Sequence, residues 1–253
     1  MSEAVEASPA VGPAPAPGLR DARFPAVGGE GRVEAVVRRL GEAIGLGLVE
    51  VGERLPAEAE LAARFDVAPV TLREALAILR QAGMIETRRG RGGGTFVRAY
   101  GGSPARVRDV SADDLRDLGE LRKAIAGAAC ALAAERAAPG EIAHLRVVLG
   151  RMSRAVDMAE FRRNDGRFHV EIAAASRSAR LTQAELQIQS ELMDLLALLP
   201  DQKRLMRLMN REHRALVDAL EARDAALARR LAEQHVDSAH DLLLGLVPAP
   251  ADG

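Results

Sequence analysis

One carboxylate and three histidines in the second half of the chain stand on apolar helical faces. Asp165 and His169 are four residues apart, so a helix places both on one face, together with Ile172. His213 and His235 each continue a stripe of leucine or methionine at helical spacing. A buried polar side chain without a partner costs free energy, so these four side chains need partners.

A divalent metal ion would bind all four side chains at once. Imidazole nitrogen and carboxylate oxygen suit zinc best, with nickel or a similar ion as alternatives. The other interpretation is that each histidine is a core residue hydrogen-bonded to its own neighbour. The spacing alone leaves both interpretations open.

A long helical region must position these residues. Residues 113–245 are rich in alanine, leucine and arginine and contain few helix breakers. The breaks, among them Pro139 and Pro200, are short, and short turns make successive helices antiparallel neighbours. The pattern therefore predicts an antiparallel bundle with helices at residues 113–137, 140–156, 158–175, 179–199, 203–222 and 224–244.

The preceding region, residues 30–99, predicts a smaller domain of mixed structure. Apolar periodicity predicts helices at about residues 33–44, 57–65 and 70–82. The short break between the second and third helices suits a helix-turn-helix. Two β-prone runs, 84–87 and 95–98, flank a glycine-rich loop and predict a hairpin. The fold class is therefore mostly α: an N-terminal winged helix-turn-helix followed by an all-helical antiparallel bundle.

Positive charge is concentrated at the end of the smaller domain. Residues 68–98 contain six arginines and two glutamates, a net of +4, whereas the whole chain carries −1. Such a patch attracts the phosphates of DNA irrespective of sequence. Arg73, one turn into the third helix, is placed to reach a base edge. Arg88, Arg89 and Arg91 on the hairpin would reach phosphates or the minor groove; a solvated arginine-rich surface is the alternative.

Three segments of this domain, Gly52–Ala62, Thr71–Leu76 and Gly90–Val97, occur in an order that resembles the DNA-binding domain of the GntR family of bacterial transcription regulators. The resemblance implies binding to a double-stranded DNA operator. The residues implied as DNA-binding are Arg54, Glu58, Thr71, Arg73, Arg88, Arg89, Arg91, Gly92 and Gly93.

The start of the third helix departs from that family pattern. The family usually has Ser-Arg there, and this chain has Ala68-Pro69. Proline suits the first position of a helix, but it has no hydrogen bond to donate to a base. The operator is therefore expected to differ from the commonest family sequence.

The helical region carries a second set of motifs. Asp165-Gly-Arg-Phe-His169, Glu212-His213 and His235 resemble the metal-binding motif of the FadR-type C-terminal domain, the FCD branch of the same family. The resemblance implies that Asp165, His169, His213 and His235 hold a divalent ion beside a small-molecule cavity. His144 and His240 match no ligand position and are expected to be surface or packing residues.

Arg122 is the candidate for binding an effector. It stands in Glu120-Leu121-Arg122, which also matches the FCD branch, and its guanidinium suits a carboxylate. The alternative is a structural ion pair. The sequence departs from the branch at Ala126, where an acidic residue is usual, and at 176–178, where Ser-Arg-Ser replaces Ser-Gly-Asn. The identity of the effector therefore stays open.

Composition excludes several other classes of protein. Aromatic residues make up 2% of the chain, too few for a single-strand binder built on stacking platforms. The single cysteine, Cys130, excludes an internal disulfide and is expected to be a small core residue. No apolar run is long enough to span a bilayer and the start lacks the features of a secretory signal. A cytoplasmic location without a membrane partner is expected.

The remaining segments predict the domain boundaries. Residues 1–29, rich in alanine and proline, and the tail 246–253 are expected to be disordered. Residues 100–112 predict a linker between the DNA-binding domain, 30–99, and the effector- and metal-binding domain, 113–245.

Together these features predict a ligand-responsive transcription regulator that acts as a homodimer on an inverted repeat. The resemblance implies a repressor, because repression relieved by ligand is the commonest mode of action in the family. A small organic acid bound near the metal would rearrange the bundle, and the linker would pass this change to the paired winged helices. In one alternative the ion itself is the effector. A metalloenzyme is a weaker alternative, because the sequence shows no placed general base. An acyl-CoA-responsive regulator would not need the metal ligands.

Overall fold

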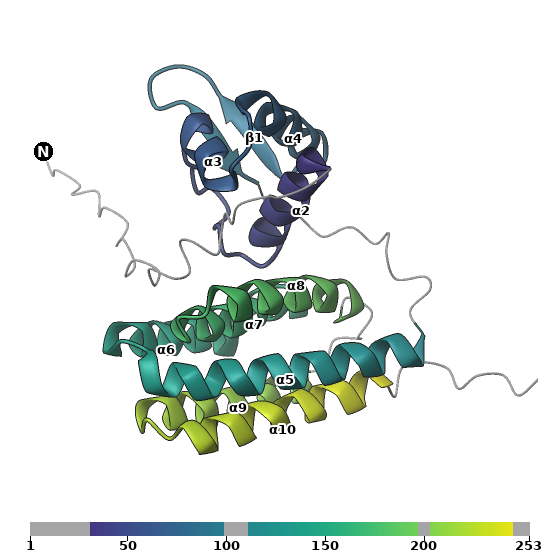
Figure 1. The fold of residues 1–253 in the computed structure, drawn as a ribbon, viewed down its shortest axis with the longest axis vertical. Helices are drawn as coiled ribbons and strands as arrows, with labels where there is room; N and C mark the ends of the chain where they lie inside the picture. The colour runs from purple at the N-terminus through teal and green to yellow at the C-terminus, as the bar shows by residue number, and fades with distance from the viewer. Residues whose placement is uncertain (1–30, 99–110, 197–202, 245–253) are drawn as a thin grey trace, which may run out of the picture.

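The computed structural model describes residues 31–98, 111–196 and 203–244, and its ribbon shows a small domain lying against a larger helical one (Figure 1). The fold is mostly helical, with a winged helix-turn-helix before a helical bundle, as the sequence predicted. The predicted arm at 1–29, the tail at 246–253 and linker residues 100–110 lie outside the described residues. The domain boundaries drawn there stay predictions.

The small domain contains three helices and a hairpin. Helices α2 (Arg32–Gly45), α3 (Glu58–Phe65) and α4 (Pro69–Gln81) precede strands β1 (Ile85–Arg88) and β2 (Gly94–Val97). The strands pair antiparallel, with Ile85 opposite Val97 and Arg88 opposite Gly94. Each element begins or ends within about two residues of its predicted limit, because apolar periodicity marks the helices and glycines mark the loop.

A tight turn joins the two helices of the helix-turn-helix. Asp66 follows α3 with a left-handed φ of 53°, a conformation that aspartate tolerates better than most residues. Pro69 then starts α4, where its missing N–H would have no helical partner in any case. Phe65 and Leu72 on either side of the turn are buried, together with Leu76, so the domain core fixes the angle between the helices.

The larger domain is a bundle in which the described connections between consecutive helices are short turns. Its helices are α5 (Ala112–Arg136), α6 (Pro139–Arg154), α7 (Met158–Ala175), α8 (Ala179–Leu196), α9 (Lys203–Glu221) and α10 (Ala225–Leu244). Ser111 caps α5 by accepting a hydrogen bond from the Asp114 amide, and Asp157 caps α7 in the same way through Glu160. Phe161, Phe168 and Leu216 lie in the apolar core that these helices share.

Helices α5 and α10 lie side by side along much of their length (Figure 1). A glycine permits this close approach: a Cβ atom built on Gly119 of α5 would lie 2.5 Å from Nδ1 of His240 on α10. Alanine-rich faces complete the contact, with Ala126 and Ala133 on α5 and Ala239 on α10 buried. Small residues therefore set the spacing of the two longest described helices.

The small domain rests on the bundle over α7 and α8, as Figure 1 shows. Val170 and Ala174 of α7 and Leu186 of α8 belong to the same apolar cluster as the core of the small domain. The two domains therefore share buried surface in addition to their connection through the chain. Within the described residues, no helix is long and apolar enough to cross a bilayer.

Candidate metal centre and nucleic-acid interface

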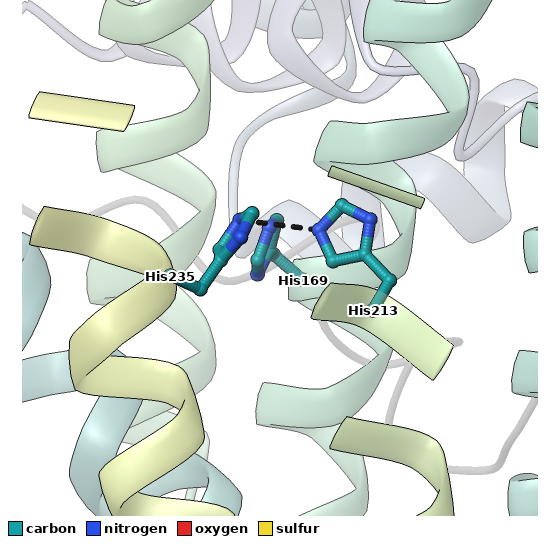
Figure 2. Close-up of side chains that lie close together, drawn as sticks. All are labelled: His169, His213 and His235. Atoms are coloured by element: carbon teal, nitrogen blue, oxygen red, sulfur yellow. Dashed lines mark hydrogen bonds between the residues drawn. The ribbon is translucent and has the colours of Figure 1, made fainter. Parts of the chain in front are cut away.

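Three histidines from three different helices meet in the bundle core (Figure 2). His169 comes from α7, His213 from α9 and His235 from α10. One ring nitrogen of each lies within 4.8 Å of the others, and the Nε2 atoms of His213 and His235 are 3.1 Å apart. All three side chains are buried. Residues separated by up to 66 positions are thus gathered at one point by the antiparallel helices.

Asp165, the fourth predicted ligand, lies beside this cluster. Its Oδ1 atom is 3.5 Å from Nε2 of His213, and the carboxylate is buried. It does not belong to the set of ligand atoms that are all mutually within 4.8 Å. The structure therefore brings three of the four predicted ligands together and places the fourth next to one of them.

Burial keeps the imidazoles neutral. It lowers the pKa of His235 to about 3, and it lowers the pKa values of His169 and His213 well below the ordinary range, with neighbouring ring charges and Arg122 adding to the effect. A neutral imidazole presents a lone pair, which is the form that binds a metal. Burial also raises the pKa of Asp165 to about 7, and the positive charge of Arg122 only partly opposes this.

Unpaired atoms at the cluster would suit a bound cation. Nε2 of His169 and Oδ1 of Asp165 are buried without a hydrogen-bond partner among the described residues. Buried polar atoms usually have partners, so such exceptions point to an ion or water. A divalent ion would accept these lone pairs and favour the ionised form of Asp165. The donor set, three imidazoles with an adjacent carboxylate, suits zinc or a similar borderline ion.

Glu212 is a residue at this site to which the sequence assigned no role. Its Oε2 atom is 2.7 Å from Nδ1 of His235, so a proton on Nδ1 is donated to the carboxylate. That hydrogen bond leaves the Nε2 lone pair of His235 facing the other histidines. Such carboxylate–histidine pairs orient metal ligands. In the sequence, Glu212 belongs to the matched Glu212-His213 motif, on a helix adjacent to α10, but the resemblance gives it no ligand position.

Arg122 is buried on α5 near the histidines. Burial lowers its pKa, whereas the charges of Glu185 and Asp165 work in the opposite direction. Its Nε atom has no hydrogen-bond partner among the described residues. The side chain lines a small pocket with Leu118, Gly119, Leu192, Val236, His240 and Leu115. A cation with unused hydrogen-bonding capacity therefore faces a pocket near the candidate metal centre.

Glu185 was also missed by the sequence analysis. It is buried on α8, where Gln189 donates a 2.7 Å hydrogen bond to its Oε1 atom, while Oε2 has no partner among the described residues. Burial raises its pKa. Thr182, Glu185 and Gln189 form a polar stripe at helical spacing on the buried face of α8. That spacing was the available signal.

The other predicted core and packing residues take structural positions. Cys130 is buried on α5, as expected, and burial raises the pKa of its thiol. His144 on α6 is also buried, with Nε2 3.2 Å from Oε1 of Glu171. His240 lines the pocket beside Arg122. His144 and His240 do not belong to the histidine cluster.

The predicted DNA-contacting residues on the helix-turn-helix lie largely at its surface. Arg73 on α4 is exposed and its Nε atom is 3.7 Å from Oε2 of Glu58 at the start of α3. Thr71 is partly exposed in the first turn of α4, beside exposed Pro69. The N-terminal turns of the second helix of such a motif enter the major groove in known complexes. Arg73 and Thr71 are positioned for that contact.

The hairpin holds the other predicted contacts. Arg88 stacks over the ring of Phe96 at 4.5 Å and pairs with Glu86, whereas Arg89 and Arg91 are exposed in the turn. Gly92 has a φ of 84°, and a Cβ on Gly93 would lie 2.6 Å from the Arg88 carbonyl oxygen, so the turn requires glycine.

Arg54 lies against the strands from the segment before α3. The backbones of Arg54 and Phe96 form an isolated antiparallel β-bridge, and the Nε atom of Arg54 would lie 2.5 Å from a Cβ atom built on Gly94. The segment before α3 is thereby attached to the β1–β2 hairpin. Arg54 thus lies in the same structural unit as Arg89 and Arg91 in the hairpin turn.

A winged helix-turn-helix with an arginine-rich surface, followed by a helical bundle with a buried histidine cluster, defines a class of DNA-binding regulator. Comparison with known families gives the same assignment. Residues 32–97 match the family described as bacterial regulatory proteins, gntR family, and residues 117–238 match the FCD domain. The chain belongs to the GntR family of transcription regulators and carries an FCD domain.

Curated relatives are likewise regulators. The chain is 42% identical over 172 residues to the putative HTH-type transcriptional regulator RmpR of Mycobacterium gastri, a match that covers 63% of this chain and 60% of that protein. It is 32% identical over 210 residues to the putative L-lactate dehydrogenase operon regulatory protein of Escherichia coli, covering 76% and 78% of the two chains. These relatives and families are transcriptional regulators, so the chain is not classed as an enzyme.

Solved structures share the fold. E. coli McbR/YncC superposes with a TM-score of 0.55 at 18% identity, covering 85% of this chain and 98% of that one. A putative GntR regulator from Rhodococcus sp. RHA1 gives a TM-score of 0.52 at 21% identity, with 86% and 99% covered. The winged helix and helical domain are therefore an arrangement already seen in this family.

Proposed function

We propose that this GntR-type regulator is a repressor that binds an inverted-repeat operator as a homodimer and responds to a small organic acid bound beside a divalent metal ion. The observation that carries the proposal is the buried cluster of His169, His213 and His235, next to Asp165 and to Arg122, whose Nε atom has no hydrogen-bond partner among the described residues. A cation centre and a buried arginine close to it together suit a carboxylate.

Binding of the ion would involve the three histidines and Asp165. A bound divalent ion, zinc in the first instance, would supply positive charge to which a carboxylate can coordinate. Arg122 would pair with that carboxylate, since its planar fork suits two oxygens. The name of the E. coli relative, an L-lactate dehydrogenase operon regulatory protein, supports a small organic acid as the effector class.

Binding of DNA would involve the first turns of α4 and the hairpin. Arg73 and Thr71 would approach base edges, with Arg88, Arg89 and Arg91 at phosphates or the minor groove. Arg54, Glu58, Gly92 and Gly93 complete the proposed interface, the glycines by letting the turn approach the backbone. Ala68 and Pro69 offer no side-chain donor, so the base contacts of this chain would start at position 71.

Capture of genomic DNA tests the regulatory role. Protein is mixed with fragmented DNA of its host at about 150 mM salt, where nonspecific contacts are weakened, and the retained fragments are sequenced. Recovery of a few fragments that share an inverted repeat supports the proposal. Equal retention of all fragments, with zinc and without it, contradicts it.

Metal analysis tests the sensory site. We expect about one zinc ion per chain after dialysis, and loss of that ion in His213→Ala. His240→Ala is the matched control, because His240 lies in the same domain but outside the cluster. Equal zinc content in the wild-type protein and His213→Ala would exclude the cluster as the metal site.

A second candidate function is supported by the same cluster. Three buried histidines from three helices join distant parts of the bundle, so the ion alone could act as the effector. In that case zinc changes operator affinity without any organic ligand. If DNA affinity changes only when an organic acid is added to the zinc-loaded protein, the first function is correct.

A further inference from the structure

Helix α7 has the candidate metal ligands on one face and the small domain on another. Successive residues of a helix point about 100° apart, given 3.6 residues per turn. Asp165 and His169 therefore point into the bundle core, while Gly166 and Val170, one position later in each case, point away from it. Val170 is buried in the apolar cluster of the small domain.

The apolar part of this contact depends on a glycine. A Cβ atom on Gly166 would lie 2.7 Å from Cδ2 of Leu46, which follows α2 in the small domain. Leu46 is itself buried, and Ala174 continues the same face of α7 two turns later. The small domain thus approaches the backbone of α7 directly beside Asp165.

The polar part of the contact is an arginine between the two domains. Nη1 of Arg167 lies 3.2 Å from the Gly47 carbonyl oxygen and 3.2 Å from Oε1 of Glu50, both in the small domain. Its Nε atom donates to Oε1 of Glu171 at 2.8 Å. Arg151 of α6 also donates to Oε1 of Glu50, at 2.9 Å. Glu50 therefore receives two arginines from the bundle.

Arg167 is held firmly. Its side chain is 6% exposed, and that of Glu171 is 4% exposed. A buried charge is tolerated only with well-placed partners, so the position of Arg167 is tied to Glu171 within α7 and to the small domain outside it. Glu50 is more exposed, and a change there removes one anchor of the contact without leaving a fully buried charge.

We propose that α7 is the element that transmits occupancy of the metal centre to the DNA-binding domain, with Gly166 and Arg167 as the positioning residues. Binding of an ion fixes Asp165 and His169. The α7 backbone is rigid over one turn, so the same adjustment displaces Gly166 and Arg167 and with them Leu46, Gly47 and Glu50. This route is a direct contact and does not pass through residues 99–110. The inference rests on the proposed metal site, but not on the effector.

Hydrogen exchange of the full chain tests the coupling, with zinc as the probe. We expect zinc to slow amide exchange in residues 46–56 of the wild-type protein by about 5-fold or more, the lower end of ordinary coupling between sites. Residues 58–65 serve as an internal reference, because α3 lies outside this contact. Zinc stoichiometry is measured on the same samples.

Two variants make the test specific. In Glu50→Gln, we expect zinc to bind as in the wild-type protein while the change in exchange at residues 46–56 falls below about 2-fold. The matched control is Glu221→Gln, which removes a similar carboxylate that pairs with Arg146 between α9 and α6. Gly166→Ala should speed exchange in residues 46–56 even without zinc, because its Cβ displaces Leu46.

Each outcome bears on a defined claim. If zinc binds and leaves exchange in residues 46–56 unchanged, or if Glu50→Gln keeps the full response, the coupling through α7 is wrong. If no zinc binds, the metal site itself is wrong, and this appears separately as zero stoichiometry. A full response in Glu221→Gln and a lost response in Glu50→Gln support the proposal.

Discussion

Burial decides the chemistry of the residues at the candidate metal centre. His169, His213 and His235 are neutral because the bundle core disfavours the imidazolium form, and Asp165 is held partly protonated for the same reason. An apolar core with four such groups would be costly if they stayed unpaired. A bound ion would reverse the balance for Asp165, because it would stabilise the charge of the carboxylate.

The metal-free protein should lose stability as the pH falls. The pKa values of the three histidines are lower in the folded than in the unfolded chain, so between about pH 6.5 and pH 5 the unfolded chain binds more protons and is favoured. Asp165 acts in the opposite direction, because its folded pKa of about 7 lies above its unfolded value and its contribution to stability is lost as the pH rises. Glu185, whose pKa burial also raises, acts in the same direction as Asp165. The three histidines outweigh these two carboxyl groups.

Urea unfolding of chelator-treated protein measures this effect. The urea concentration at the unfolding midpoint should decrease as the pH is lowered from 6.5 to 5. The decrease should be smaller in His235→Gln, because this variant lacks one of the three histidines that take up a proton on unfolding. A midpoint that is flat over this interval would show that the histidines are not buried as neutral groups.

Glu212 should orient His235 for metal binding. Removing its charge in Glu212→Gln weakens the hydrogen bond to Nδ1, and changes at such outer partners reduce metal affinity about 10–100-fold. Competition with a coloured zinc chelator measures the affinity, and nitrogen NMR of the metal-free protein reports the His235 tautomer. Glu221→Gln should change neither. Wild-type affinity in Glu212→Gln would leave Glu212 with a packing role only.

Arg73 is the best candidate for a base contact. Arg73→Ala should reduce affinity for the captured operator by about 1–3 kcal/mol, a loss of roughly 5- to 150-fold, and reduce affinity for random DNA much less. Arg146→Ala, on the bundle, is the control for the loss of one positive charge. Equal losses on both DNAs would make Arg73 a phosphate contact.

At the scale of helices and strands, local sequence signals were sufficient to predict where the elements begin and end. They were not sufficient to predict the contacts between residues far apart in the sequence. The limits of α2, α4 and α7 follow from apolar spacing and from residues such as Pro69 and Asp157. The meeting of His169, His213 and His235 was predicted from their apolar faces together with the family resemblance. The partners Glu212 and Glu185 were not, because such contacts depend on the register and rotation of neighbouring helices, which a single sequence does not specify.

The contact of α5 with α10 should be sensitive to one added methyl group. Gly119→Ala places a Cβ against the ring of His240, and overpacking of this kind costs about 1–3 kcal/mol. Gly140→Ala is the control, since its Cβ meets no atom within 4 Å and alanine favours the helix. Thermal or urea unfolding measures both variants. Equal stability of Gly119→Ala and Gly140→Ala would mean that His240 moves aside freely.

At the scale of the whole molecule, the direct contact between the two domains offers a route for a regulatory signal in addition to the linker. The sequence predicted that the linker would carry the signal, and linker residues 100–110 lie outside the described part of the structure. Val170, Arg167 and Gly166 would provide the shorter route that we propose, because they lie within one turn of the candidate metal ligands and contact the small domain. The bundle that holds the candidate metal centre is thus also the platform on which the DNA-binding domain rests.

One winged helix reads too few base pairs to select a site in a genome, so we expect two copies to bind together. The two-fold symmetry of a homodimer places identical half-sites at a fixed spacing, and operator symmetry follows from it. When both halves are engaged, the second binds as an intramolecular event, so destroying one half-site should weaken binding by about 100-fold or more. Titration of the intact operator and of the half-operator measures this difference, and ultracentrifugation of the complex counts the chains. Two chains on the intact operator, with strongly reduced affinity for the half-operator, are the expected result. One chain per DNA with equal affinity for both would contradict the dimer, and the selectivity would then have to come from a single domain whose first recognition-helix residue is a proline.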